Sequence, residues 1–136
     1  QEEAVTPDAI LEGFIHESEE AIIIEHCGGD ALQLEDTQII LWKGHEEPIT
    51  ITFDSAGMAY TLDAREQGYV IEGSNNGWWN AGASFKYLFE EGLHFQEVRA
   101  IVIDTVSNSV VMSDNVQTGT STTYLRTTQL ENDGGG

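Results

Sequence analysis

Short strand-forming segments, separated by turn residues, recur along the whole sequence, and this spacing limits the fold more than any other feature. Segments rich in β-branched and aromatic residues return every 10 to 15 residues, with Gly, Asn, Asp or Ser clusters between them. The segment 48–53 alternates with period 2, which puts Ile49, Ile51 and Phe53 on one face. The pattern predicts an all-β fold, an antiparallel β-sandwich of Ig-like or jelly-roll-like type with seven to nine strands.

The expected strands are defined by these segments and by the turn residues that end them. They cover residues 21–26, 37–43, 48–53, 67–72, 84–89, 98–104, 110–112 and 116–118, with a turn at Asp114–Asn115 between the last two. The side chains expected to be buried are apolar residues of these strands: Ile22, Ile24, Ile40, Ile49, Ile51, Phe53, Val102 and Val111.

The length of 136 residues fits one domain with its own core. Residues 1–17 are expected to be an N-terminal linker or short turn that follows a missing membrane or filament helix, because the chain begins without Met or a signal peptide. Residues 18–118 are expected to form the sandwich. Residues 119–136 are expected to be a Ser/Thr-rich edge segment and a flexible Gly tail.

The formal charge of −19 restricts the partners of this chain. A surface this acidic repels nucleic-acid phosphates, and it argues against docking on anionic lipid head groups. The acidic residues suit a solvated surface in a salty medium or a cation-rich partner. We therefore expect no nucleic-acid binding and a soluble monomer for the sequence as it stands.

No combination of residues in the sequence indicates catalysis. The four histidines form no HExxH pair, and Cys27 has no CxxC partner, so a zinc site has no support. His26 and Cys27 are neighbours in a strand and point to opposite faces, which prevents easy proton sharing. Calcium is the fairer alternative, because Asp30, Glu35 and Asp36 lie close together in the sequence. We expect no enzyme activity, no metal ligands and no cofactor.

Two adjacent tryptophans stand in a polar segment that is rich in Gly and Asn. Trp78 and Trp79 could stack against a sugar ring. Alternatively, one of them could turn inward and cap the core while its indole N–H finds a carbonyl. Core capping is favoured for Trp79, and the role of Trp78 stays open.

The segment 26–32 begins with His26, continues through Gly28, Gly29 and Asp30, and is followed by an apolar segment at 39–41. Together with the W-x-x-G segment at 79–82 and the strand pair at 98–118, it resembles the archaeal type IV pilin family. The resemblance implies a β-sandwich carried on an N-terminal hydrophobic helix that packs in a filament core. It makes the motif a structural turn, in which two glycines permit positive φ and Asp30 binds backbone N–H groups just beyond it.

The function expected from this resemblance is that of the extracellular domain of a pilin-like cell-surface filament subunit, with a structural or adhesive role. Its partners would be other pilin-like subunits, joined through the missing helix, and surface glycans. Its place would be extracellular, at the cell surface, anchored in the membrane or filament in the full-length precursor. The alternative is a secreted carbohydrate-binding β-sandwich, with or without calcium, that uses Trp78 and Trp79.

Overall fold

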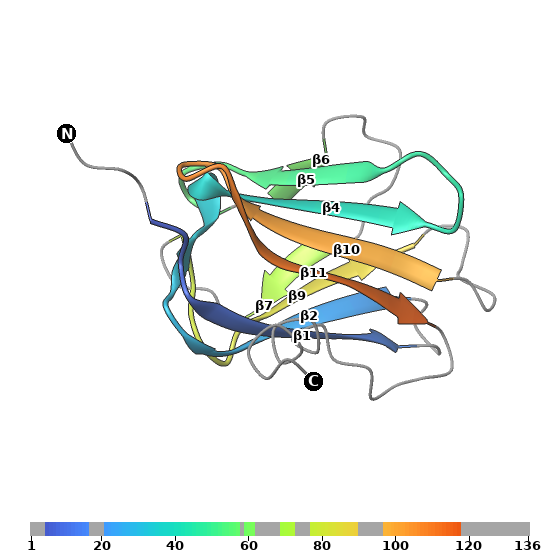
Figure 1. Cartoon of the computed structure of the whole chain (residues 1–136), viewed down its shortest axis with the longest axis horizontal. Helices are drawn as coiled ribbons and strands as arrows, with labels where there is room; N and C mark the ends of the chain where they lie inside the picture. The colour runs from blue at the N-terminus through green and yellow to red at the C-terminus, as the bar shows by residue number, and fades with distance from the viewer. Residues whose placement is uncertain are drawn as a thin grey trace.

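A computed structural model gives the fold of residues 5–16, 21–57, 59–61, 69–72, 77–89 and 97–117. In these residues the regular structure consists of β-strands and one short 3-10 helix, so the all-β prediction is confirmed (Figure 1). The elements are β1 (Ala9–His16), β2 (Ala21–Gly29), β3 (Leu32–Gln33), η1 (Leu34–Asp36), β4 (Thr37–Lys43), β5 (Ile49–Phe53), β6 (Ala59–Thr61), β7 (Tyr69–Glu72), β8 (Trp78–Trp79), β9 (Ser84–Leu88), β10 (Glu97–Asp104) and β11 (Ser109–Gln117).

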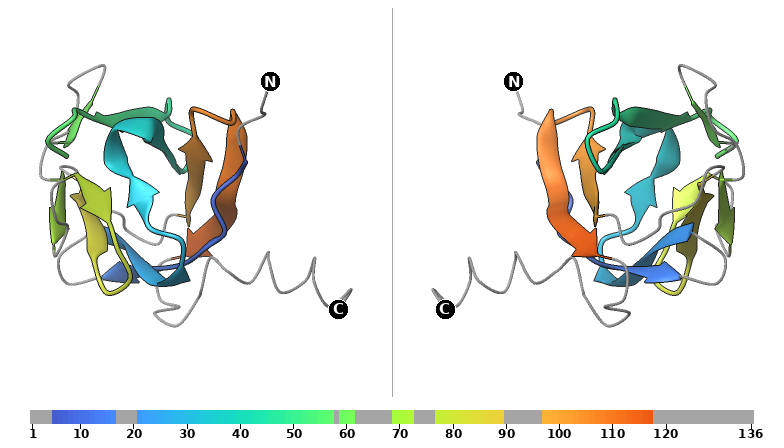
Figure 2. Two further views of the ribbon diagram at one scale, coloured as in Figure 1. Left: turned by 90° about the vertical axis from the view of Figure 1, so that its left-hand side faces the viewer. Right: turned by 90° about the vertical axis from the view of Figure 1, so that its right-hand side faces the viewer.

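Two antiparallel sheets contain nine of the strands that the structure describes, as predicted. One sheet has four strands in the order β1-β2-β9-β7, and the other has five in the order β11-β10-β4-β5-β6. The edges of the two sheets approach each other, because β1 lies beside β11 and β6 beside β7 (Figure 2). The remaining short strands, β3 and β8, pair with each other as a separate ribbon.

The strand order distinguishes between the two predicted sandwich types. An Ig variable-type domain places strands A, B, E and D in one sheet and strands G, F, C, C′ and C″ in the other. The two sheets of this chain follow the same order when the nine strands are read along the sequence. The sandwich is therefore Ig-like rather than jelly-roll-like, and it lacks the Ig inter-sheet disulfide because the chain has one cysteine.

The core lies between the sheets and is built from alternate residues of each long strand. In β4, for example, Thr37, Ile39, Leu41 and Lys43 point inward, and the residues between them are half-buried on the outer face. Seven of the eight side chains expected in the core are buried: Ile22, Ile24, Ile49, Ile51, Phe53, Val102 and Val111. The prediction for Ile40 is wrong, because its neighbours on both sides take the inward positions.

The N-terminal boundary of the sandwich also differs from the prediction. Residues 9–16, expected to belong to a linker or short turn, form the full strand β1 and pair with β2 along its length. The strand alternates, with Leu11, Gly13 and Ile15 facing the core. Glu12 and Gly13 inside this segment weaken its strand signal, but burial of the alternate apolar residues outweighs this low propensity.

The end of the sandwich is simpler than expected. The proposed turn at Asp114–Asn115 does not form, and β11 runs without interruption from Ser109 to Gln117. Asp114 stands opposite Ala100 and Asn115 opposite Arg99, so both belong to the ladder with β10. The proposed tail at 119–136 lies outside the described residues.

Candidate functional site

His26 is the centre of the motif that was predicted to be a structural turn. Its side chain is almost fully buried, on the inner face of β2 near the end of the strand. The backbone N–H of Gly28 donates to Nδ1 at 3.3 Å, and Nε2 lies 2.7 Å from the carbonyl oxygen of Asp30. Because an N–H can only donate and a carbonyl can only accept, the ring proton belongs on Nε2. Both ring nitrogens are thus engaged with the backbone of the motif itself.

The two residues at the end of the motif tie it to the start of β1. The backbone N–H of Asp30 donates to the carbonyl oxygen of Asp8 at 3.0 Å, and Asp30 Oδ2 accepts from the N–H of Asp8 at 2.9 Å. Gly29 has a φ of +83°, and a Cβ there would collide with the Asp8 carbonyl oxygen. The carboxylate therefore binds a residue upstream in the sequence, rather than N–H groups just beyond it as predicted.

The tryptophan pair is divided between the core and the surface. Trp79 is fully buried, and its indole N–H donates to the carbonyl oxygen of Ala83 at 3.0 Å. Its ring meets the His26 ring edge-on, with centroids 6.3 Å apart and an interplanar angle of 70°. Trp78 points the other way and is 42% exposed. A stacking surface made by both rings is therefore absent, and only Trp78 is open to a ligand.

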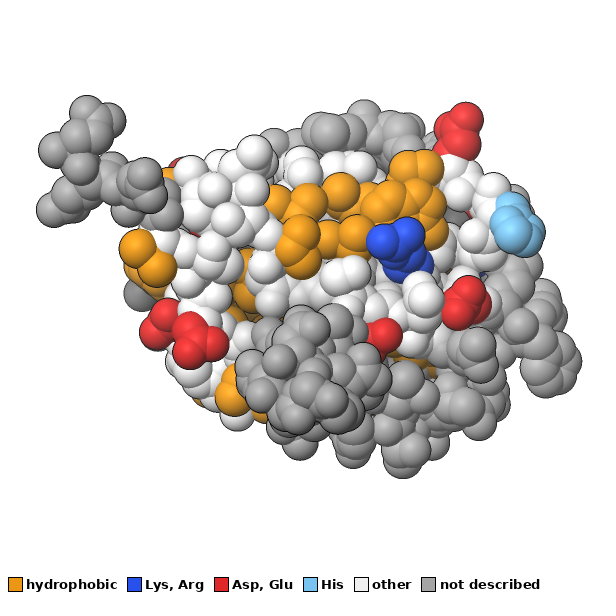
Figure 3. All heavy atoms as spheres, viewed as in Figure 1, with side chains coloured by type: hydrophobic (Ala, Val, Ile, Leu, Met, Phe, Trp, Pro, Cys, Tyr) orange, Lys and Arg blue, Asp and Glu red, His pale blue; other side chains and the backbone are white. Residues whose placement is uncertain are grey.

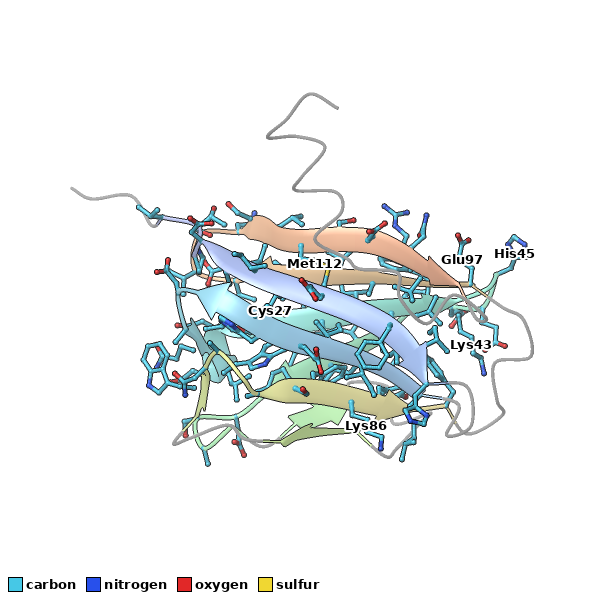
Figure 4. The ribbon with its side chains drawn as sticks, turned by 90° about the horizontal axis from the view of Figure 1, so that it is seen from below. Cys27, Lys43, His45, Lys86, Glu97 and Met112 are labelled. Carbon is cyan, nitrogen blue, oxygen red and sulfur yellow. The ribbon has the colours of Figure 1, made fainter. Side chains whose placement is uncertain are left out.

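An open cleft of about 560 Å³ lies at one end of the sandwich, lined by Lys43, Gly44, His45, Glu46 and Glu97. Figure 4 shows Lys43, His45 and Glu97 together at this end, whereas Cys27 and Lys86 lie on the strands of the other sheet. The cleft forms where the turn after β4 meets the start of β10, and the Gly44 N–H donates to the Glu97 carbonyl oxygen at 2.9 Å.

Lys43 is the unusual residue of the cleft, because its side chain is only 2% exposed. Its ammonium nitrogen lies 3.9 Å from Glu46 Oε2 and 5.4 Å from the centroid of the Phe89 ring. A carboxylate and an aromatic face both stabilise a cation, so the buried charge is compensated from two sides. In this arrangement Lys43 anchors the β4–β5 turn to the core.

The acidic residues considered for calcium are engaged in separate contacts. Asp30 binds the Asp8 backbone, Glu35 accepts from the side-chain amide of Gln33 at 3.1 Å, and the carbonyl of Asp36 accepts from Thr105. Within the part of the chain that the structure describes, no group of three His, Cys, Asp or Glu side chains could hold a metal ion.

His26 and Cys27, the only candidate pair for nucleophile and base, face opposite sides of β2. His26 is buried, whereas Cys27 is exposed, with Sγ 3.8 Å from the carbonyl oxygen of Glu25. Their separation follows from the alternation of side chains along a strand. The described ranges also contain no helix that is long and apolar enough to cross a membrane.

The chain was compared with protein-family models, with curated proteins and with solved structures. No family model, no curated protein and no solved structure matches the chain.

The buried Lys43 and its cleft were not anticipated from the sequence, although a signal was present. Inward positions recur at every second residue of 37–43, so the phase that buries Ile39 and Leu41 also buries Lys43. If Ile40 is placed in the core instead, the same alternation places Lys43 on the outer face, and its burial is not predicted.

Proposed function

We propose that this chain is the extracellular domain of a pilin-like cell-surface filament subunit with a structural or adhesive role. The observation that carries the proposal is the corner formed by His26, Gly29 and Asp30. Its polar groups bind backbone atoms of their own segment and of Asp8, and its buried imidazole packs against Trp79. Residues engaged in this way hold strands together, as the resemblance to archaeal type IV pilins implies.

The fold and the charge agree with this proposal. An Ig-like sandwich is a rigid module whose two ends and two faces are available for neighbours. The net charge of −19 keeps a surface domain solvated in a salty medium. In the proposal, contacts between subunits run through a hydrophobic helix encoded upstream of residue 1, and the domain is displayed outside the cell.

The coding sequence upstream of residue 1 provides one test. A filament subunit requires a short basic leader followed by about 20 apolar residues, enough for a membrane-spanning helix. A cleavable secretory signal with its short apolar region would contradict the proposal and support a secreted module.

The localisation test uses antibodies raised against this 136-residue chain on cells of its source organism. We expect immunogold label along surface filaments, and no label on cells in which the gene is deleted. Label confined to the culture medium, or spread over the cell body without filaments, would contradict the proposal.

A carbohydrate-binding module remains a second candidate because Trp78 is exposed on β8 beside the exposed Gln33, its register partner. An exposed indole next to an amide is a surface on which a sugar ring can stack and hydrogen-bond. A glycan array probed with the parent chain and with Trp78→Ala tests it. Binding to a defined glycan that is lost in Trp78→Ala would establish this function, and the absence of binding would remove it.

A further inference from the structure

The outer face of the five-stranded sheet carries a strip of apolar side chains. Figure 3 shows this strip crossing the middle of the face, with one basic side chain on it. Because Val98, Ala100, Val102 and Asp104 point into the core, the residues that alternate with them along β10 point outward. The strip consists of the outward-facing apolar residues of three neighbouring strands: Ile40, Trp42, Ile101, Ile103 and Val110.

The strand register makes the strip continuous. Ile101 of β10 stands opposite Ile40 of β4, and Ile103 stands opposite Val110 of β11. Arg99 stands opposite Trp42, and its guanidinium carbon lies 5.4 Å from the centroid of that ring. Four of the five apolar residues are half-buried, and Val110 is 54% exposed. A contiguous apolar strip of a few hundred Å² is comparable to the largest patch of an ordinary monomer, and such patches often serve as binding surfaces.

The charge of the strip contrasts with that of the whole molecule. Among the described outward residues of β4, β5 and β10, the only acidic side chain is Glu97, at the start of β10. The outer face of the other sheet also exposes apolar residues, Phe14 opposite Ile23, but Glu12 and Glu25 form the next opposed pair. Two copies that met through that second face would bring four carboxylates together.

We propose that the strip is a weak docking surface for a second copy of this chain. Each copy carries −19, so two copies repel wherever their acidic surfaces approach, and they repel least through this strip. A basic partner would be attracted to the acidic surface instead, and Arg99 disfavours it here. The choice of a second copy rests on the proposed function, because copies are nearest neighbours in a filament.

The size of the strip sets the strength of the contact. It spans three strands from β11 to β4 and residues 99–103 of β10, roughly 10 Å by 17 Å before side-chain radii are added. This corresponds to about 200–300 Å² per copy, compared with about 800 Å² in a stable interface. The contact is therefore transient in free solution and becomes occupied where copies are tethered side by side, since tethering raises the local concentration to the millimolar range.

Sedimentation equilibrium of the 136-residue chain tests this inference, with Ile101→Glu and Ile23→Glu as matched variants. Both replace a half-buried outward isoleucine of an inner strand by the same charge, on opposite sheets. For the parent and for Ile23→Glu, we expect the weight-average mass to rise above 15.0 kDa with protein concentration. It should rise further between about 10 mM and 0.5 M NaCl, because salt screens the repulsion. For Ile101→Glu, it should stay at the monomer value.

Several results would overturn the inference. The parent could stay at 15.0 kDa at every concentration, or its association could weaken with salt, as expected for binding of a basic ligand. Association could also be lost equally in Ile101→Glu and Ile23→Glu. If Ile101→Glu does not fold by circular dichroism, concentration-dependent amide shifts of the parent decide. Shifts centred on β4 and β10 support the strip, and shifts centred on β2 and β9 refute it. Filament labelling by antibody together with a monomeric parent would refute this surface while leaving the proposed function intact.

Discussion

Replacing Trp79 by alanine tests the corner at the end of β2 most sharply. The side chain is fully buried, so its removal leaves a large cavity, which costs about 3–5 kcal/mol of unfolding free energy. The lost indole hydrogen bond adds about 1 kcal/mol. Its acceptor, the Ala83 carbonyl, keeps a second donor in the backbone N–H of His26 at 3.0 Å, so no buried oxygen is stranded. We expect a total of about 4–6 kcal/mol.

Urea unfolding followed by far-UV circular dichroism measures this loss without depending on tryptophan fluorescence. With a slope of about 1.5–2 kcal/mol per molar, the midpoint should fall by about 2–4 M. Trp78→Ala is the matched control, because its ring is 42% exposed, and it should cost less than about 1 kcal/mol. Trp79→Phe keeps an aromatic ring and should lose about 1–2 kcal/mol. A Trp79→Ala protein as stable as the parent, or a Trp78→Ala protein equally damaged, would refute the reasoning.

Three further measurements test other parts of the structure. Gly29→Ala should lower the unfolding free energy in urea by at least about 2 kcal/mol, because its Cβ would meet the Asp8 carbonyl oxygen. The control Gly82→Ala has positive φ but open space around the Cβ, and it should cost about 1 kcal/mol; equal losses would contradict this. Lys43→Met should be neutral or stabilising by up to about 2 kcal/mol, since Glu46 is half exposed and remains hydrated; a loss above about 2 kcal/mol would show that the charge itself is needed. The thermal midpoint of the chain should rise between about 10 mM and 1 M NaCl, because salt screens the net charge of −19. A flat or falling midpoint would show that the acidic side chains are already neutralised, most simply by bound cations.

The fold class was accessible from the sequence because strand length and turn chemistry are local properties. The segment 49–53 has a threonine between each pair of apolar residues, so its buried face follows directly. The segment 39–41 is apolar at each position and fits either phase, and the choice of Ile40 as a core residue was wrong for that reason. Strand order depends on long-range pairing, which no local pattern specifies.

The boundaries failed where tertiary contacts overrode local preference. Asp114 and Asn115 favour turns, yet they continue β11 because the ladder with β10 satisfies their backbone groups. Residues 9–16 contain a glycine and a glutamate, yet they form β1 because their alternate residues cover one edge of the core.

The candidate site shows the same division. Positive φ at Gly29 and the opposite orientation of His26 and Cys27 follow from residue type and strand alternation. The bond between Asp30 and Asp8 could not be foreseen, because it joins residues far apart in the sequence. The cleft at Lys43 was not predicted for a different reason. With Ile40 assigned to the core, alternation along β4 places Lys43 on the outer face.

The central claim, that this domain belongs to a surface filament subunit, is tested most directly by helical reconstruction of filaments sheared from the source cells. We expect each subunit to contain a nine-stranded sandwich with the strand order seen here, outside a helical core, and the density to fit the side chains of this sequence. Filaments whose subunits exclude this sequence, together with recovery of the chain from the culture medium alone, would contradict it.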